Sequence, residues 1–462
     1  MKIYFQNSLS RQKEEFKSIK KNKVGLYTCG PTVYDYPHIG NLSAYVIWDV
    51  LKRFLLSQGY DVKHVMNLTD VGHLTSDADE GEDKMETAKR REKKTAWEVA
   101  DYFIGVFKTS IKELNILEPS KFLRVTDVIQ EQIDFAKVMD EKGYLYKISD
   151  GMYFDTSKLN NYGQLANLAE VDQQEGARVA KNPEKKNASD FAVWKFSPEN
   201  SQRDMEWDSP WGKGFPGWHL ECSVMSQMEL GDTFDIHTGG VEHLTVHHPN
   251  EMAQSEAVTG KLQANIWLHN QHLRYEGGKM SKSAGVFIKL TDIKEKGYSP
   301  MALRYFILQN NYRKPHNFSW DSLSASQNAL KNILREISFY DDKKGRVDKA
   351  SLEEFYTALA DDLNIAKALS SIQKVIEIKL EEADKLATIL EMDKVLGLDL
   401  ATLRTKSLAL PKEAEDLLKK RQEVRDDKDW PRSDQLRDQL KGISVEVQDT
   451  PDGQKAIYDW LK

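Results

Sequence analysis

Residues 24–41 of the chain read VGLYTCGPTVYDYPHIGN. The first five residues form an apolar run that is typical of a short buried strand, and the rest contains the glycines and prolines of a loop. Apolar residues then recur at helical spacing through residues 42–58, until Gly59 ends the helix. Residues 61–68 (DVKHVMNL) supply the next strand. This order of strand, loop, helix and strand predicts half of a parallel α/β nucleotide-binding fold.

Two segments far apart in the sequence indicate phosphate chemistry. His38-Ile39-Gly40-Asn41 stands where the predicted helix begins, and the backbone amides at a helix N-terminus can bind an anion. Gly40 removes a side chain where adenine or ribose must come close. Residues 277–283 (GGKMSKS) carry two lysines that can neutralise charge on a leaving pyrophosphate. Each segment alone is most often a solvated turn, but their combination indicates ATP chemistry.

The composition is that of a soluble globular protein. Its 462 residues suffice for two to four domains, and 40% of them are hydrophobic and 30% charged. No stretch approaches the ~18 uninterrupted apolar residues of a membrane helix, and residues 1–23 lack the apolar core of a secretory signal. We therefore expect a cytoplasmic protein without a membrane partner. The net charge of -7 does not exclude nucleic acid, because phosphate contacts need only local basic surface.

The cysteines and histidines offer a candidate metal site. Cys29 and Cys222 are the only cysteines, and four of the eleven histidines lie between residues 237 and 248. A proline that suits the start of a helix follows this cluster, so His247 and Glu251 are expected to converge on one ion. Thiolate, imidazole and carboxylate groups are all zinc ligands. From spacing alone, buried reduced thiols beside a solvated histidine cluster remain the alternative.

The two segments and their surroundings resemble class I aminoacyl-tRNA synthetases. Residues 279–283 are identical to the family's KMSKS signature, whereas the first signature, HIGH in the family, ends here in Asn41. Three further blocks resemble the cysteinyl-tRNA synthetases in particular, and the resemblance runs nearly end to end. These blocks are YTCGPTVY at 27–34, GWHLECS at 217–223 and NSLSRQKEEF at 7–16.

The resemblance implies a cysteine–tRNA ligase that works in two steps. L-cysteine and ATP first give cysteinyl-adenylate and pyrophosphate, and the terminal adenosine of tRNA(Cys) then attacks the adenylate. No protein nucleophile is required, so catalysis consists of positioning and charge stabilisation. We expect His38, Lys279 and Lys282 to act on the phosphates together with Mg²⁺. The implied ATP site comprises Pro31, His38, Gly40, Asn41, Lys279, Met280, Ser281, Lys282 and Ser283.

The resemblance also implies one zinc ion per chain. Its implied ligands are Cys29, Cys222, His247 and Glu251. The physical purpose is to discriminate cysteine from serine, because a borderline-soft metal binds a thiolate far better than a neutral hydroxyl. No editing domain is then needed. The implied lining of the cysteine pocket is Thr32, Thr69, Trp218 and His237.

We expect an α/β fold with a Rossmann-like class I catalytic domain, followed by an all-α bundle and a small C-terminal module. Three- and four-residue apolar spacing predicts the bundle. The module resembles the family's anticodon-binding module, in which Lys428, Trp430, Arg432 and Arg437 are suited to contact bases or phosphates, although packing is equally compatible with Trp430. The expected boundaries are 1–70 with 216–310 for the split catalytic domain, 71–215 for a connective insertion that handles the acceptor end of tRNA, 311–400 for the bundle and 411–462 for the module.

Some departures from the family pattern concern local ATP and tRNA contacts. They are Leu42-Ser43, Val71-Gly72-His73, Glu242 and Pro249. One alternative function is an enzyme that makes the same adenylate but passes cysteine to a small amine, as in mycothiol synthesis; it has no evident need for an anticodon module. The other is a synthetase-like RNA-binding protein that has lost its chemistry, which the intact KMSKS segment disfavours. The sequence does not fix the oligomeric state, and a monomer is compatible with it.

Overall fold

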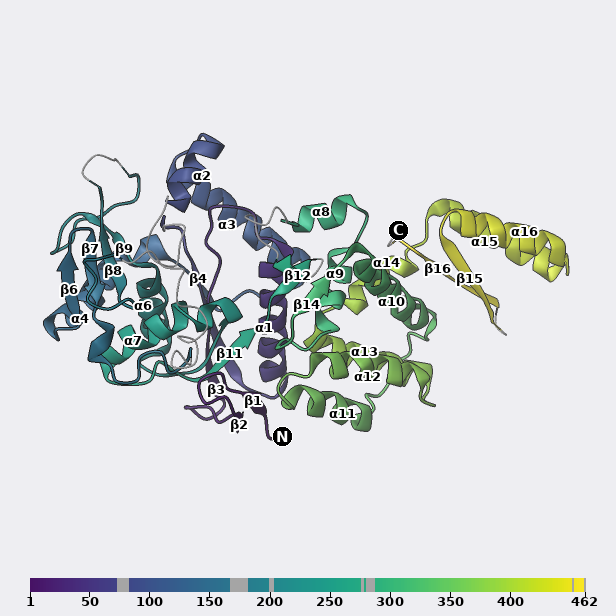
Figure 1. The fold of residues 1–462 in the computed structure, drawn as a ribbon. Helices are drawn as coiled ribbons and strands as arrows, with labels where there is room; N and C mark the ends of the chain where they lie inside the picture. The colour runs from purple at the N-terminus through teal and green to yellow at the C-terminus, as the bar shows by residue number, and fades with distance from the viewer. Residues whose placement is uncertain are drawn as a thin grey trace. The chain divides into compact units, whose positions relative to one another are not determined.

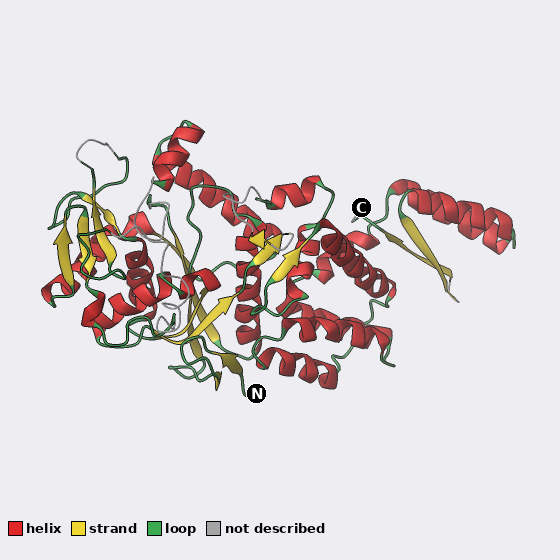
Figure 2. Cartoon of the chain, in the orientation of Figure 1, coloured by secondary structure: helices red, strands yellow, loops and turns green. Residues whose placement is uncertain are grey.

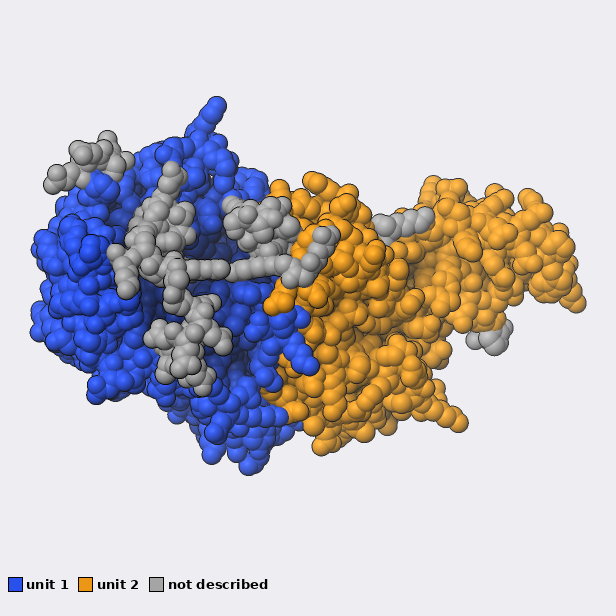
Figure 3. All heavy atoms as spheres, in the orientation of Figure 1, with its two compact units in different colours: residues 1–112, 117–273, 312–315 blue, residues 113–116, 274–311, 316–462 orange. Residues whose placement is uncertain are grey.

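The computed structural model describes residues 1–72, 83–166, 182–198, 203–275, 287–450 and 453–460, and the backbone of 278–279. The chain divides into two compact units (Figure 3). The first comprises residues 1–112, 117–273 and 312–315, and the second comprises residues 113–116, 274–311 and 316–462. Among the described residues, no helix has the length and apolar character needed to cross a membrane.

A five-stranded parallel sheet forms the centre of the first unit (Figure 1). Its order is β11-β10-β3-β4-β5, so strands from distant parts of the sequence are neighbours. The strands are β3 (Lys23–Thr28), β4 (Asp61–Leu68), β5 (Lys121–Arg124), β10 (Phe234–Gly240) and β11 (Ala264–Asn270). A two-stranded hairpin, β1 (Tyr4–Gln6) with β2 (Lys13–Glu15), precedes them. The predicted strand, helix and strand order of residues 24–68 is confirmed, and with it the Rossmann-like α/β class.

Helix α1 (Ile39–Ser57) crosses from β3 to β4 and buries most of its length. The buried apolar residues include Val46, Val50 and Leu51, with no measurable exposure at any of the three. At its start, the backbone N–H of Asn41 donates to His38 Nδ1 and the backbone N–H of His38 donates to Asn41 Oδ1. This reciprocal cap satisfies two backbone donors. The helix therefore begins three residues before the expected Leu42.

The residues between the two halves of the sheet form helices and a second sheet. The helices are α2 (Lys84–Glu92), α3 (Ala96–Glu113) and α4 (Ile129–Glu141). The second sheet is antiparallel, in the order β6-β7-β8-β9. Its strands are β6 (Leu145–Ile148), β7 (Gly151–Phe154), β8 (Phe191–Phe196) and β9 (Gly214–Pro216). Strand β5, within the expected insertion at 71–215, pairs with β4 and extends the parallel sheet.

The second unit is mainly helical, as Figure 2 shows. Its helices up to residue 408 are α8 (Leu290–Glu295), α9 (Pro300–Leu308), α10 (Trp320–Phe339), α11 (Lys349–Ala360), α12 (Ile365–Glu377), α13 (Glu382–Leu396) and α14 (Leu400–Leu408). In α12 the buried residues Ile365, Ala368, Leu369 and Ile372 follow helical spacing. This confirms a helical bundle after the parallel sheet.

The chain ends in a small module of two helices and a hairpin. These elements are α15 (Lys412–Asp426), α16 (Trp430–Gly442), β15 (Val445–Thr450) and β16 (Gly453–Tyr458). Its apolar core is small and includes Ala414, Leu440 and Val445. A short sheet of β12 (Leu273–Tyr275), β13 (Gly278–Lys279) and β14 (His316–Phe318) lies earlier in the chain.

Candidate active site

The predicted metal and cysteine-pocket residues gather around the carboxyl ends of the central strands. Cys29 follows β3 directly, and Thr69 follows β4. Two further helices contribute, α6 (Trp218–Leu230) and α7 (His247–Thr259). The carboxyl edge is where open parallel α/β sheets bind their ligands. The topology thus brings together residues that lie more than two hundred positions apart.

Four buried donor groups form a compact cluster. The Sγ atoms of Cys29 and Cys222 lie 3.9 Å apart, and Cys29 Sγ lies 3.7 Å from Glu251 Oε1. His247 Nε2 lies 3.2 Å from the same oxygen. All four donor atoms lie within 4.8 Å of one another. Because His247 is the first residue of α7 and Glu251 the fifth, one helical turn presents both side chains on the same face.

These separations fit a tetrahedral ion. Zinc–sulfur bonds of ~2.3 Å and zinc–nitrogen or zinc–oxygen bonds of ~2.0 Å separate tetrahedral donors by roughly 3.3–3.8 Å. Burial raises the pKa of the Cys29 thiol well above its ordinary value and also raises the pKa of Cys222. A cation would reverse this penalty, because a metal-bound thiol is deprotonated. The arrangement is therefore a possible Cys/His/Glu metal site.

A second donor set shares Cys29 and Glu251 with the first. It replaces Cys222 and His247 by His237 and His248. His248 Nε2 lies 3.3 Å from Cys29 Sγ, and His237 Nε2 lies 2.9 Å from Glu251 Oε2. Geometry alone admits both sets. The first offers two soft sulfur donors and the second only one, so a metal that favours thiolates favours the first.

Further histidines surround the donors and orient them. His219 Nδ1 lies 2.9 Å from His247 Nδ1, and His248 Nδ1 lies 2.7 Å from His269 Nε2. His269 Nδ1 in turn lies 2.8 Å from Ser8 Oγ. Burial and the neighbouring histidines lower the pKa values of His248 and His269 well below the ordinary value. These imidazoles are therefore neutral at pH 7, which is the form that coordinates metals.

Of the four residues expected to line the cysteine pocket, Trp218 and His237 contact the cluster, and Thr69 contacts the neighbour of Cys222. Thr32 and Thr69 form an isolated parallel bridge between the loop after β3 and the end of β4. The Trp218 ring lies 5.1 Å from the His247 ring. His237 is fully buried, stacks on Trp267, and contacts the donor cluster through its Nε2 atom, which lies 2.9 Å from Glu251 Oε2. Sequence reasoning gave His237 a place in the pocket wall, but its contact with Glu251 makes it a metal-donor candidate as well.

The first signature forms the N-terminus of α1. A Cβ at position 40 would lie 2.8 Å from two atoms of the His38 ring, which explains the glycine there. Pro31 accepts the backbone N–H of Thr69 over 3.0 Å. In the second signature, Lys279 pairs with Arg274 in the β12–β13 ladder. Met280, Ser281, Lys282 and Ser283 lie outside the described residues.

The departures from the family pattern have local structural roles. Ser43 Oγ donates to the Gly40 carbonyl over 2.7 Å, and Leu42 is fully buried. At Gly72, a Cβ would lie 2.2 Å from Asp83 Oδ1, so glycine makes room for this carboxylate. Glu242 Oε2 lies 3.5 Å from His272 Nδ1. Val71 is buried, while His73 lies outside the described residues.

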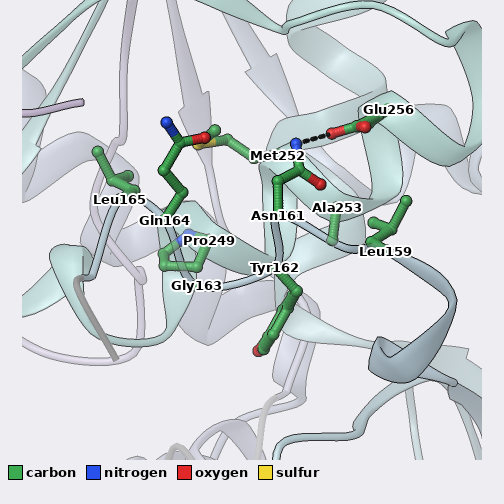
Figure 4. A pocket seen from close by; sticks show the side chains of 10 residues that line it. All are labelled: Leu159, Asn161, Tyr162, Gly163, Gln164, Leu165, Pro249, Met252, Ala253 and Glu256. Carbon is green, nitrogen blue, oxygen red and sulfur yellow. Dashed lines mark hydrogen bonds between the residues drawn. The ribbon is translucent and has the colours of Figure 1, made fainter. Parts of the chain in front are cut away.

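Two cavities lie apart from the donor cluster. Pro249 lines one of about 10 Å³, which the loop at 159–165 forms with α7 and where Asn161 Nδ2 donates to Glu256 Oε2 (Figure 4). Such a volume holds about one water molecule. The other cavity, of about 310 Å³, lies against the amino ends of β3, β4 and β10, at the opposite edge of the sheet from Cys29. Neither is the predicted substrate site.

Several residues of the site were not predicted from the sequence. They are His219, His269, Asn67 and Glu221. His248 belonged to the predicted histidine cluster but was not named as a ligand. His219 and Glu221 belong to the GWHLECS block, so their proximity to Cys222 was a usable signal. Asn67 and His269 lie in strands that offer no such motif, and their part in the site follows from sheet pairing.

Comparisons with known proteins identify the family of the chain. Residues 15–328 match the family model described as tRNA synthetases class I (C) catalytic domain, and residues 408–455 match the Cysteinyl-tRNA ligase anticodon binding domain. The chain is 46% identical to Cysteine–tRNA ligase 1 of Burkholderia lata, over 98% of this chain and 97% of the relative. It is 43% identical to Cysteine–tRNA ligase of Novosphingobium aromaticivorans, over 98% and 96%.

A solved structure shares the fold. Methionyl-tRNA synthetase of Mycobacterium tuberculosis, in complex with methionyl-adenylate, matches with a TM-score of 0.56 and 14% identity, over 85% of this chain and 94% of that one. At this identity the likeness concerns the fold alone. The sequence matches decide the family: the chain belongs to the cysteine–tRNA ligases, which are class I tRNA synthetases.

Proposed function

We propose that the protein activates L-cysteine with ATP and transfers it to the 3′ end of tRNA(Cys). The observation that carries this proposal is the buried cluster of two thiols, an imidazole and a carboxylate at the carboxyl edge of the nucleotide-binding sheet. The family membership and the match to an anticodon-binding domain support tRNA as the acceptor. They give no support to the alternative in which a small amine receives cysteine.

Zinc fits the donor set of Cys29, Cys222, His247 and Glu251. When bound, it would supply a soft positive centre that favours a thiolate over a neutral hydroxyl. The protein's own contribution is a rigid, buried frame around that position. Trp218 borders this frame beside His247 and is suited to close an apolar wall over the cysteine methylene. Thr32 and Thr69, paired across two segments, are suited to form a polar wall.

The ATP site is proposed at the N-terminus of α1. His38 Nδ1 accepts a backbone N–H, so the neutral ring carries its proton on Nε2. This tautomer is the one that donates to a phosphate oxygen. The helix amides add partial positive charge at the same end. Lys279 and Lys282 would stabilise the charge that develops as pyrophosphate leaves, and Mg²⁺ would add positive charge at the phosphates.

Cysteine-dependent ATP–pyrophosphate exchange and tRNA charging test this function together. We expect exchange with cysteine and not with serine, charging of tRNA(Cys), and one zinc per chain by metal analysis. Zinc near zero in protein that was never exposed to a chelator would contradict the metal assignment. Ligation of cysteine to an amino sugar without tRNA charging would establish the small-amine alternative.

The cellular setting follows from the reaction. A tRNA-charging enzyme works beside the ribosomal machinery, so we place the protein in the cytoplasm. The four proposed metal donors belong to one chain, which is compatible with a monomer. Size-exclusion chromatography with light scattering measures the oligomeric state.

A further inference from the structure

A buried chain of hydrogen bonds joins the two segments that carry the cysteines. The backbone N–H of Gly30 donates to Asn67 Oδ1 over 2.7 Å. Asn67 Nδ2 donates to Thr69 Oγ1 over 2.9 Å, and the Thr69 hydroxyl donates to Glu221 Oε2 over 2.7 Å. Gly30 and Glu221, at the two ends, are the direct sequence neighbours of the cysteines. This series of hydrogen bonds therefore connects the segment of Cys29 to the segment of Cys222.

The three side chains that form this hydrogen-bonded series are buried, so water does not compete for their hydrogen bonds. Asn67 is 2% exposed, Thr69 1% and Glu221 0%. Asn67 Oδ1 also accepts the Tyr27 hydroxyl over 3.3 Å, which fixes the amide with its nitrogen toward Thr69. The donors all point the same way and end at a carboxylate, which accepts but does not donate when ionised. Such a satisfied buried network holds its members in one arrangement.

The backbone at one end of the chain is held tightly as well. A Cβ at position 30 would lie 1.7 Å from the Asn67 carbonyl oxygen, so only glycine permits this approach. Thr69 donates its N–H to Pro31 and accepts that of Val33, both over 3.0 Å. The segment after β3 and the end of β4 thus form one rigid pair. Helix α6, which carries Cys222, is tied to this pair through Glu221.

We infer that Asn67 and Glu221 are positioning residues for the metal donors and that they act through the Thr69 hydroxyl. They hold the segments of Cys29 and Cys222 at the separation that places the two sulfurs 3.9 Å apart. This inference rests on the proposed function, which assigns those sulfurs to a zinc ion. Loss of groups that orient metal ligands typically lowers metal affinity by about 10- to 100-fold.

The test uses the full-length protein and two substitutions, each of which removes one hydrogen bond of this network. Glu221→Ala removes the acceptor, and Asn67→Asp keeps the acceptor for Gly30 but removes the donor to Thr69. Glu221→Gln retains an amide oxygen that can accept and serves as the conservative rescue. Thr126→Val is the matched control, because it removes another threonine–carboxylate hydrogen bond of 2.7 Å, to Asp70.

Two readouts follow the metal itself. One is the rate at which a chelator removes zinc, and the other is the visible spectrum of the cobalt-substituted protein as cysteine is added. We expect zinc loss to be about 10- to 100-fold faster in Glu221→Ala and Asn67→Asp. The KM for cysteine should rise while the KM for ATP stays within about twofold. Glu221→Gln should recover most of the difference, and Thr126→Val should match the wild type.

The outcomes separate this inference from the proposed function. If the wild-type protein holds zinc and both variants release it at the wild-type rate, the inference is wrong and the proposed function stands. A wild-type chain without zinc overturns the metal site and the inference together. Should Glu221→Ala fail to fold, the isosteric Asn67→Asp decides the matter by the same two readouts.

Discussion

The donor cluster and the C-terminal module are built in opposite ways. Cys29 and Cys222 meet across 193 positions of sequence and are buried. In the module, Asp449 accepts hydrogen bonds from Arg421 and Arg437, which lie 28 and 12 positions away. The Asp449 side chain remains 31% exposed, and the Arg421 hydrogen bond is the chief cause that lowers its pKa. The cluster thus depends on contacts between residues far apart in the sequence, whereas the ion pairs of the module join residues close in sequence and are partly exposed to solvent.

This difference matches two kinds of recognition, of a small amino acid and of RNA. Discrimination of cysteine from serine requires a desolvated, preorganised set of donors, which only a large core provides. A polyanionic RNA is bound instead by exposed basic and aromatic groups that stay accessible. Trp430, 54% exposed with Arg425 5.8 Å from its ring, has that character.

The largest expected effect comes from the cluster. Cys222→Ala removes one of two sulfur donors, so zinc should be lost and cysteine-dependent exchange should fall by about 10³-fold or more. The affinity for ATP should hardly change, because the proposed nucleotide site lies at the N-terminus of α1 and contains none of the four donors. Metal analysis and exchange kinetics measure both. An equally severe loss of ATP binding would show that the cluster and the nucleotide site are one cooperative unit.

Lys282→Ala tests the proposed role of this lysine, which is to stabilise the transition state and not to bind the ground-state substrates. We expect adenylate formation to slow by roughly 10²- to 10³-fold, equivalent to about 2.7–4 kcal/mol. Cysteine affinity should barely move. Pre-steady-state kinetics separate the two quantities. A wild-type activation rate with weaker ATP binding would mean that the lysine segment only holds substrate.

Acid should weaken the parallel sheet before the module. Burial lowers the pKa of His64 to about 3, below its ordinary value of 6.5. Protonation therefore favours the unfolded state. The contribution of His64 is fully present above pH 6.5 and is lost toward pH 3, by about 1.4 kcal/mol per pH unit between these values. The pKa of Asp449 is lowered instead, so its contribution persists down to about pH 4.

Hydrogen exchange between pH 7 and 4, corrected for intrinsic rates, compares these two regions in one molecule. Peptides of β3 and β4 should lose protection first, and those of β15 and β16 later. His64→Gln removes the titrating group and should flatten the pH dependence of the sheet. An unchanged slope in this variant would assign the acid sensitivity to other groups.

The smallest expected effect comes from removing the module. Deletion of residues 411–462 should leave cysteine-dependent ATP–pyrophosphate exchange intact, because the donor cluster lies in the other unit. The tRNA concentration needed for charging should rise by about tenfold, equivalent to ~1.4 kcal/mol. Charging assays over a range of tRNA concentrations measure it. A truncated enzyme that charges as efficiently as the full chain would refute the anticodon assignment.

Local patterns in the sequence predicted the elements well. The apolar run before Cys29 and the helical spacing after it gave a strand and helix close to those observed, because backbone periodicity is a local property. The helix start was misplaced, since the reciprocal cap between His38 and Asn41 depends on side-chain geometry. Strand β5 was not predicted, because four residues of strand carry little periodic signal.

What the sequence determined by itself is the family and its chemistry. The order of its motifs and the blocks around the two cysteines carry the resemblance to cysteinyl-tRNA synthetases, and it is this resemblance that implied cysteine activation. Only the tertiary structure decided which groups meet. Parallel pairing of β3 with β4 and β10 brings distant segments together, adds His248 and His237 to the possible donors, and links the cysteines through Asn67, Thr69 and Glu221. The physical reason is that burial and hydrogen-bond partners depend on long-range packing, which local patterns do not encode.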